Sequence, residues 1–212
     1  MEQKEKSKKS KYIKDYLKIY FDEWLIIDIE NIVKMIKVNN EKFTLPPILL
    51  VSAGIDFLGG LECGFSSNSG CRSRKFIKDW MGRFNNLYIV KGMSECIYSS
   101  VRCGSSHQAT YKKGVVISSK NNRKNHLHVN TSSELGDRIF IHALQFSEDF
   151  IKAQRIFRDE YISKNIDKVY RNLKEMVGKP KKEDLNDLIK YLKSNNLKFG
   201  NDIICPSEGI GE

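Results

Sequence analysis

Hydrophobic residues recur every three or four positions through the first third of the chain, which is the period of an amphipathic helix. The pattern predicts one helix over residues 12–38, ended by Asn39 and Asn40 and preceded by a loose basic tail over residues 1–11. Pro46 and Pro47 suit the first turn of a second helix, because proline fits where the backbone N–H needs no partner. Residues 48–61 of that helix are apolar nearly all round, so we expect it to lie at the centre of the fold.

The spacing of the apolar residues changes in the middle of the chain. Two shorter helices are predicted over residues 74–84 and 86–101, each with apolar residues at helical spacing. Two short β-like runs then flank an asparagine-rich turn, which predicts a β-hairpin near residues 109–131.

A long amphipathic helix is predicted over residues 133–161, after which the composition turns charged and polar. Two further helical stretches, 166–177 and 182–195, flank a Gly-Lys-Pro breaker. The predicted fold is therefore mainly α. It consists of a helical domain over 12–162 with an inserted β-hairpin, followed by a helical extension and an irregular tail over 163–212.

Composition excludes several classes of protein. Of the 212 residues, 40% are hydrophobic and 10% aromatic, so the chain can build a core and is not disordered throughout. The best apolar run, Ile48–Val51, is soon interrupted by Ser52 and Asp56, so no membrane span is predicted, and no signal-peptide core follows the charged start. We expect a cytoplasmic protein. The five cysteines form no CxxC pair, which favours reduced thiols over disulfides or a zinc cluster.

Positive charge is concentrated in one quarter of the chain, residues 72–124, which we call the basic block. It contains twelve lysines and arginines against two carboxylates, Asp79 and Glu95, and so matches the net charge of +10 of the whole chain. A phosphate-bearing partner is the first physical expectation, and a solvated basic face is the alternative.

One motif combines an arginine and a histidine in this block. Arg102 comes at the end of a predicted apolar helix, and His107 follows five residues later. The segment resembles the HEPN superfamily, whose signature is an arginine, four to six residues and a histidine inside a helical bundle. The matching positions, within a resemblance that covers about residues 12–161, are Tyr98, Val101, Arg102, Gly104 and His107.

The resemblance implies a HEPN-like bundle acting as a metal-independent endoribonuclease of toxin or phage-defence type, with no cofactor. Its members dimerise so that two motifs face one cleft, which implies a homodimer here. His107 could act as base or acid at neutral pH, and Arg102 could clamp phosphate oxygens. A toxin would also have an antitoxin or defence-system partner. Together with the charge, the resemblance gives the expected RNA-binding residues as Arg72, Arg74, Lys112, Lys113, Arg123 and Lys124.

An inactive HEPN-like module that binds nucleic acid, a nucleotide or a protein partner is the alternative, and a purely structural subunit is a third. The sequence departs from the nuclease pattern at Cys103, where a polar residue is usual, and at Ala109, where some members have tyrosine.

Other candidate groups are weaker. His126 and His128 would share one face of a strand and could hold a metal or touch RNA, but surface residues are the simpler interpretation. His142 is expected to be structural. Asp56 and Glu62 on the apolar helix should pair with a basic residue such as Arg74 or Arg102, because an unpaired buried carboxylate is costly, and metal-ion catalysis by this pair is the alternative.

Overall fold

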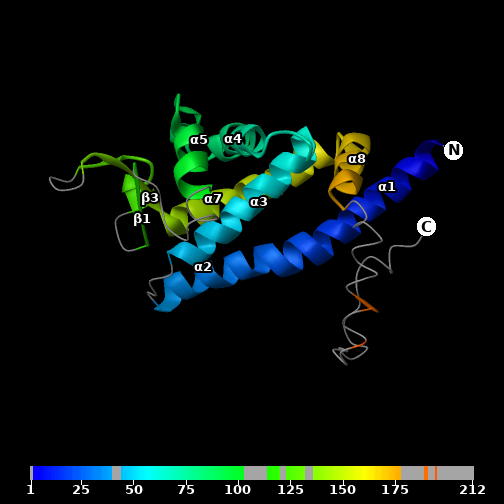
Figure 1. The fold of residues 1–212 in the computed structure, drawn as a ribbon, viewed down its shortest axis with the longest axis horizontal. Helices are drawn as coiled ribbons and strands as arrows, with labels where there is room; N and C mark the ends of the chain where they lie inside the picture. Colours follow the sequence, from blue (N-terminus) through cyan, green and yellow to red (C-terminus); the bar gives the residue numbers. More distant parts are fainter. Residues whose placement is uncertain are drawn as a thin grey trace. The chain divides into compact units, whose positions relative to one another are not determined.

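The computed structural model of the protein describes residues 2–39, 44–102, 114–119, 123–131, 136–177, 189, 190 and 194. These residues form a mainly helical fold, as the sequence predicts. Figure 1 shows α3 (Leu45–Cys63) and α7 (Ala143–Ile156) side by side at the centre. The helix α2 (Ile27–Asn39) packs on both of them, and α4 (Ser69–Asp79) packs on α3.

One continuous helical rod opens the chain. It consists of α1 (Glu2–Tyr16), the π-helical segment η1 (Leu17–Ile26) and α2. The predicted loose tail over residues 1–11 is therefore wrong, because the lysine, glutamate and glutamine residues there favour helix and no glycine or proline interrupts them. Within η1 the wider π turn matches the four- and five-residue spacing of the buried side chains, which are Leu17, Phe21 and Ile26.

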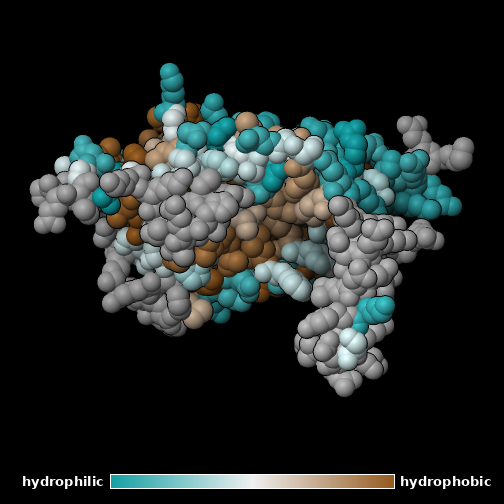
Figure 2. Space-filling view, viewed as in Figure 1, coloured by the Kyte–Doolittle hydropathy of each residue, from teal (hydrophilic) through white to brown (hydrophobic). Residues whose placement is uncertain are grey.

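The central helix α3 is buried along most of its length, as predicted. Glycines allow its neighbours to approach closely, because a Cβ on Gly59 would lie 2.6 Å from the carbonyl oxygen of Arg72 and one on Gly54 would lie 2.3 Å from the Phe150 ring. In the described part of the chain, α3 is the one helix long and apolar enough to cross a membrane, and 61% of its apolar window is buried inside the protein. Figure 2 shows the hydrophobic surface that remains along α3, and the hydrophilic surface of the N-terminal part of α1.

Aromatic side chains fill the core between α4 and the helix formed by α7 and η6 (Phe157–Ile162). The Phe157 ring lies 5.6 Å from that of Phe76 and 5.0 Å from that of Trp80, both in edge-on contact. Such pairs fix the relative position of the helices that carry them.

The predicted hairpin is wrong in its pairing. The strands β1 (Val115–Ser118) and β2 (Val129–Asn130) are not neighbours, because β3 (Arg138–His142) lies between them. β1 pairs with β3 in parallel and β2 pairs with it antiparallel. The sequence pattern predicts only two strands because the third, Arg-Ile-Phe-Ile-His, also fits the start of a long helix.

Two predicted helices are accordingly shorter or interrupted. The long helix begins at Ala143 rather than near 133. His142 is its N-terminal cap. The predicted helix over 86–101 divides into η3 (Asn86–Ile89) and a second helix made of α5 (Met93–Cys96) and η4 (Ile97–Arg102). Gly92 separates them in the left-handed region, with a φ of 89°.

The chain divides into two compact units, Met1–Leu173 and Lys174–Glu212. The first unit therefore extends beyond the predicted boundary at residue 162 and includes most of α8 (Ile166–Met176). Val169 and Leu173 of α8 are fully buried, and the Asn172 side chain donates to the carbonyl oxygen of Leu61. In the second unit the structure describes residues 174–177, 189, 190 and 194.

Candidate functional site

The predicted catalytic pair begins at the end of η4. Arg102 is the last residue of this helix, and its neighbours Ile97 and Val101 are buried. His107 lies outside the described residues, as do Lys112 and Lys113.

Contacts with the start of α4 hold η4 in place. The Tyr98 hydroxyl lies 3.1 Å from the hydroxyl of Ser69, and the Arg74 guanidinium lies 5.6 Å from the centre of the Tyr98 ring. Arg74 also pairs with Glu95 at 2.7 Å. Tyr98 therefore holds the helix that ends at Arg102 against α4.

Ion pairs occupy much of the basic block. Within the described residues, five of its cations contact carboxylates, four of which come from outside the block: Arg72 with Asp56, Arg74 with Glu95, Lys75 with Glu62, Arg83 with Glu160, and Arg123 with Glu148. The charge excess seen in the sequence is thus partly neutralised by residues distant in the chain.

Arg72 has a structural role. Its guanidinium donates through Nε and Nη2 to the two carboxylate oxygens of Asp56, both at 3.0 Å, and through Nη1 to the carbonyl oxygens of Phe65 and Ser67. This bidentate, half-buried pair joins α3 to α4 and leaves the guanidinium engaged on all sides. The expectation that Arg72 binds RNA stays a prediction.

The carboxylates of α3 pair with basic residues, as expected, although not with those named. Asp56 binds Arg72, and Glu62 binds Lys75 at 3.0 Å and accepts a hydrogen bond from the Trp80 indole at 3.1 Å. Hydrogen bonds from Lys75 to Asp79 and to Glu62 raise the pKa of Lys75 against the opposing effect of burial. In the described part of the chain, no cluster of three or more histidine, cysteine, aspartate or glutamate side chains could hold a metal ion.

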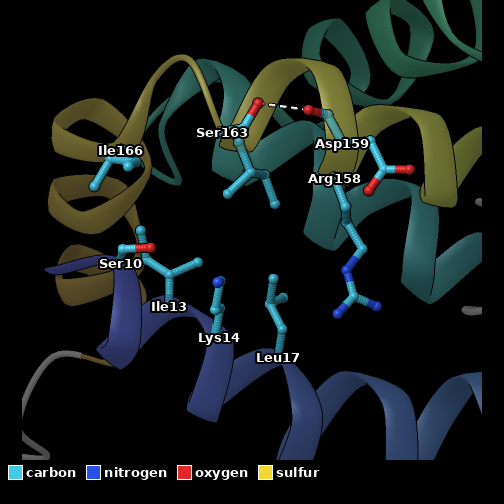
Figure 3. Close-up of a pocket in the computed structure, with 9 residues that line it drawn as sticks. Ser10, Ile13, Lys14, Leu17, Arg158, Asp159, Ser163 and Ile166 are labelled. Atoms are coloured by element: carbon cyan, nitrogen blue, oxygen red, sulfur yellow. Dashed lines mark hydrogen bonds between the residues drawn. The ribbon is translucent and has the colours of Figure 1, made fainter. Parts of the chain in front are cut away.

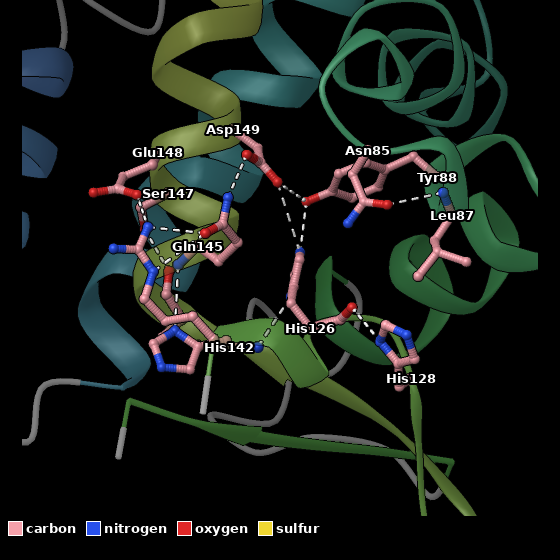
Figure 4. A network of polar contacts seen from close by, with 12 residues as sticks. Asn85, Leu87, Tyr88, His126, His128, His142, Gln145, Ser147, Glu148 and Asp149 are labelled. Atoms are coloured by element: carbon pink, nitrogen blue, oxygen red, sulfur yellow. Dashed lines mark hydrogen bonds and ion pairs between the residues drawn. The ribbon is translucent and has the colours of Figure 1, made fainter. Parts of the chain in front are cut away.

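A buried polar network is the feature that sequence reasoning missed (Figure 4). His126 was expected at the surface, but its side chain is 2% exposed, beside Tyr88 at 0% and Asp149 at 1%. His126 lies 38 positions and Asp149 lies 61 positions after Tyr88 in the chain, and no local pattern in the sequence links the three residues.

The hydrogen bonds of this network fix the proton on His126. The backbone N–H of His142 donates to His126 Nδ1 at 3.1 Å, so the ring proton lies on Nε2. Nε2 then donates to the Tyr88 hydroxyl at 2.8 Å, and Tyr88 donates to Asp149 at 3.2 Å. The Gln145 side chain completes the network by donating to the other Asp149 carboxylate oxygen at 2.7 Å.

Burial controls the charges in this network. It lowers the pKa of His126 to about 3, with smaller contributions from His142, His128 and Arg123. Burial also raises the pKa of Asp149, against the opposing hydrogen bonds from Gln145 and Tyr88. The network is closed to solvent and satisfied by its own groups, so it fastens η3, the sheet and α7 together rather than meeting a substrate.

A separate surface cavity of about 420 Å³ lies between α1 and the turn from η6 to α8 (Figure 3). Its lining includes the apolar side chains of Ile13, Leu17 and Ile162, together with Lys14. Arg158 also lines the cavity, but its guanidinium pairs with Asp22 at 3.0 Å. None of the site residues predicted from the sequence lines this cavity.

The remaining predicted residues lie in a short helical turn before β2 and at the start of α7. Arg123 donates to Gln145 at 2.8 Å and pairs with Glu148, while Lys124 lies next to it, exposed, in η5 (Arg123–Asn125). His142 is buried and accepts a hydrogen bond from the backbone N–H of Gln145 at 3.4 Å, a helix-capping role that agrees with its expected structural function.

Comparisons of this chain with protein-family models, with curated proteins and with solved structures found no match.

Proposed function

We propose that the protein is a metal-independent endoribonuclease of HEPN type, active as a homodimer in a cytoplasmic toxin or phage-defence system. The observation that carries the proposal is the spacing of Arg102 and His107 directly after an apolar helix in a mainly helical domain. The contacts of Tyr98 with α4 support it, because they give the helix ending at Arg102 a fixed position.

The chemistry requires three functions: a base for the ribose 2′-hydroxyl, an acid for the leaving 5′-oxygen, and a cation for the phosphorane charge. Histidine titrates near neutral pH and can serve as base or acid, and arginine stays charged and can hold two phosphate oxygens. One chain supplies one arginine and one histidine, so a second copy would supply the complementary group.

The test is cleavage of a single-stranded RNA in the presence of EDTA, with the product ends identified by mass spectrometry. We expect 2′,3′-cyclic phosphate ends from the wild-type protein. His107→Ala should reduce the rate by about 10²- to 10⁴-fold through loss of the proton-transferring group. Arg102→Ala should cost roughly 3 kcal/mol of transition-state stabilisation, or about 10²-fold.

Matched controls are available in the same chain. His128→Ala and Arg171→Ala replace an exposed histidine and an exposed arginine, and both should cleave like the wild type. Cleavage that requires added Mg²⁺ or Mn²⁺ would contradict the proposed chemistry.

An inactive HEPN-like module that binds nucleic acid, a nucleotide or a protein partner such as an antitoxin is the second candidate. Cys103 and Ala109 favour it, since both depart from the nuclease pattern. Wild-type protein that cuts no RNA under any condition but binds it would support this candidate.

A further inference from the structure

Exposed lysines gather on one face of the N-terminal rod. Lys4, Lys8, Lys11 and Lys18 are separated by four, three and seven residues, which places them on one side of a helix, opposite the buried Ile13. We call these four residues the lysine row. All four are exposed, and within the described residues none of them forms an ion pair. One carboxylate, Asp15, lies on the same face.

The rod holds the lysine row rigid. Elsewhere on α1, Lys9 pairs with Asp167 of α8 at 2.9 Å, and the Tyr12 ring packs edge-on against Tyr170 at 5.3 Å. The lysines are therefore displayed at fixed spacing over about 20 Å, from a rise of about 1.5 Å per residue. The lysine row differs in this from the basic block, where carboxylates neutralise the charge of five described cations.

An exposed aromatic side chain follows the lysine row on the rod. Trp24 is 67% exposed, whereas Trp80, the other tryptophan of the chain, is 6% exposed. A flat, accessible indole is a platform on which an unpaired base can stack. A row of cations followed by an aromatic ring is the combination by which proteins bind single-stranded nucleic acid.

We propose that the lysine row and Trp24 form a binding track for single-stranded RNA, separate from Arg102. The choice of RNA as the nucleic acid rests on the proposed function, whereas the charge and stacking arguments stand independently of it. A membrane-surface helix would need a broad apolar face beside its lysines, but Ile13 and Leu17 of the rod are buried in the core. A track remote from the reacting phosphate strengthens the binding of the substrate and of the transition state equally. It therefore lowers KM and leaves kcat unchanged.

The first experiment measures binding of a fluorescein-labelled 20-nucleotide uridine RNA by anisotropy at 50 and 200 mM NaCl. Four phosphate contacts on a single strand give a fall in affinity of about 50-fold between these salt concentrations, from a slope of about −0.7 per contact. The variant with Lys4, Lys8, Lys11 and Lys18 replaced by Gln should lose this part of the salt dependence. The matched control replaces four exposed lysines outside both the rod face and the basic block by Gln, with the same change of charge: Lys34, Lys152, Lys164 and Lys168.

The second experiment uses the tryptophan fluorescence of the full chain. Because Trp80 is buried, stacking of a base should quench the emission of Trp24, and Trp24→Leu should abolish the quenching. Single-stranded RNA should quench, and a fully paired duplex of the same length should not, because its bases are already stacked.

The outcomes separate this inference from the nuclease. RNA that binds through the lysine row but is never cut supports the track and contradicts the nuclease. RNA that is cut equally well, with equal KM, by wild type and the lysine-row variant contradicts the track and leaves the nuclease. Equal loss of affinity in the control variant, or no RNA binding at all, overturns the track. So does binding to phosphatidylserine vesicles through the lysine row without quenching by RNA.

Discussion

His126 is held uncharged by the groups that surround it. A backbone N–H occupies Nδ1, the Tyr88 hydroxyl accepts from Nε2, and burial lowers the pKa to about 3. Protonation would put a second proton on Nδ1, where it would face the N–H of His142. The histidine therefore favours the folded state only while it stays neutral.

Stability should consequently fall in mild acid. The unfolded chain has a histidine with an ordinary pKa near 6.5 and binds more protons than the folded chain below that pH, so acid favours unfolding. Between pH 7.5 and 5.5, His126 should remove about 1.4 kcal/mol from the free energy of unfolding. The raised pKa of Asp149 acts in the opposite direction, because the folded chain holds that proton more tightly than the unfolded chain does.

Urea denaturation at pH 7.5 and 5.5 checks this prediction, with His126→Gln compared against the exposed-site control His128→Gln. The pH dependence should shrink in the first variant and persist in the second. An NMR titration in which the His126 ring signals move between pH 7.5 and 5.5 would show that the histidine is not held neutral.

Arg72 and Asp56 provide a second prediction at this scale. Arg72→Met leaves a half-buried carboxylate without its bidentate partner, and unpaired buried charges are costly. We expect a loss of about 3 kcal/mol in the free energy of unfolding, the lower end of the range for a broken buried pair. Arg155→Met, which breaks the exposed pair with Glu30, should cost less than about 1 kcal/mol in the same thermal or urea assay.

The contact between α3 and α4 depends on the absence of a side chain at Gly59. Alanine in an open helix position is more stable than glycine by about 1 kcal/mol, so Gly59→Ala would stabilise an isolated helix. In the protein the added Cβ would lie 2.6 Å from the backbone carbonyl oxygen of Arg72, and neither helix can yield cheaply.

Gly59→Ala should therefore destabilise the protein by about 1–3 kcal/mol, a typical cost of overpacking. The sign of the change distinguishes packing from helix propensity, and it is measured by urea denaturation. Ala53→Gly, at an exposed position of the same helix, should cost only about the propensity difference of 1 kcal/mol. A more stable Gly59→Ala protein would refute the close approach of these helices.

Assembly is the prediction that belongs to the whole molecule. If each chain supplies one Arg102 and one His107, activity per chain should rise with protein concentration through the dimer dissociation constant. Light scattering should give about twice the mass of the 24.5 kDa chain at concentrations where cleavage is full. A strictly monomeric protein that still cleaves RNA would remove the composite site while leaving the nuclease activity.

The sequence by itself determined the helices whose local pattern and packing agree. The rod from residue 12 onward follows from apolar periodicity, whereas α3 follows from a run that is apolar nearly all round and begins with two prolines. It also placed Arg102 at the end of a helix, and it singled out the carboxylates Asp56 and Glu62, which could not be buried without a basic partner. These features depend on residues close together in the chain, so a local pattern suffices to predict them.

Only the tertiary structure decided which distant residues meet. β3 joins the sheet because β1 and β2 both pair with it, although its local pattern also fits the start of a helix. The same holds for Arg72 with Asp56, and for His126 with Tyr88 and Asp149. A local pattern carries no information about such partners, because each is chosen by three-dimensional packing that brings together segments far apart in the chain. The tertiary structure thus decided which charges of the basic block are neutralised, whereas the sequence determined only how many there are.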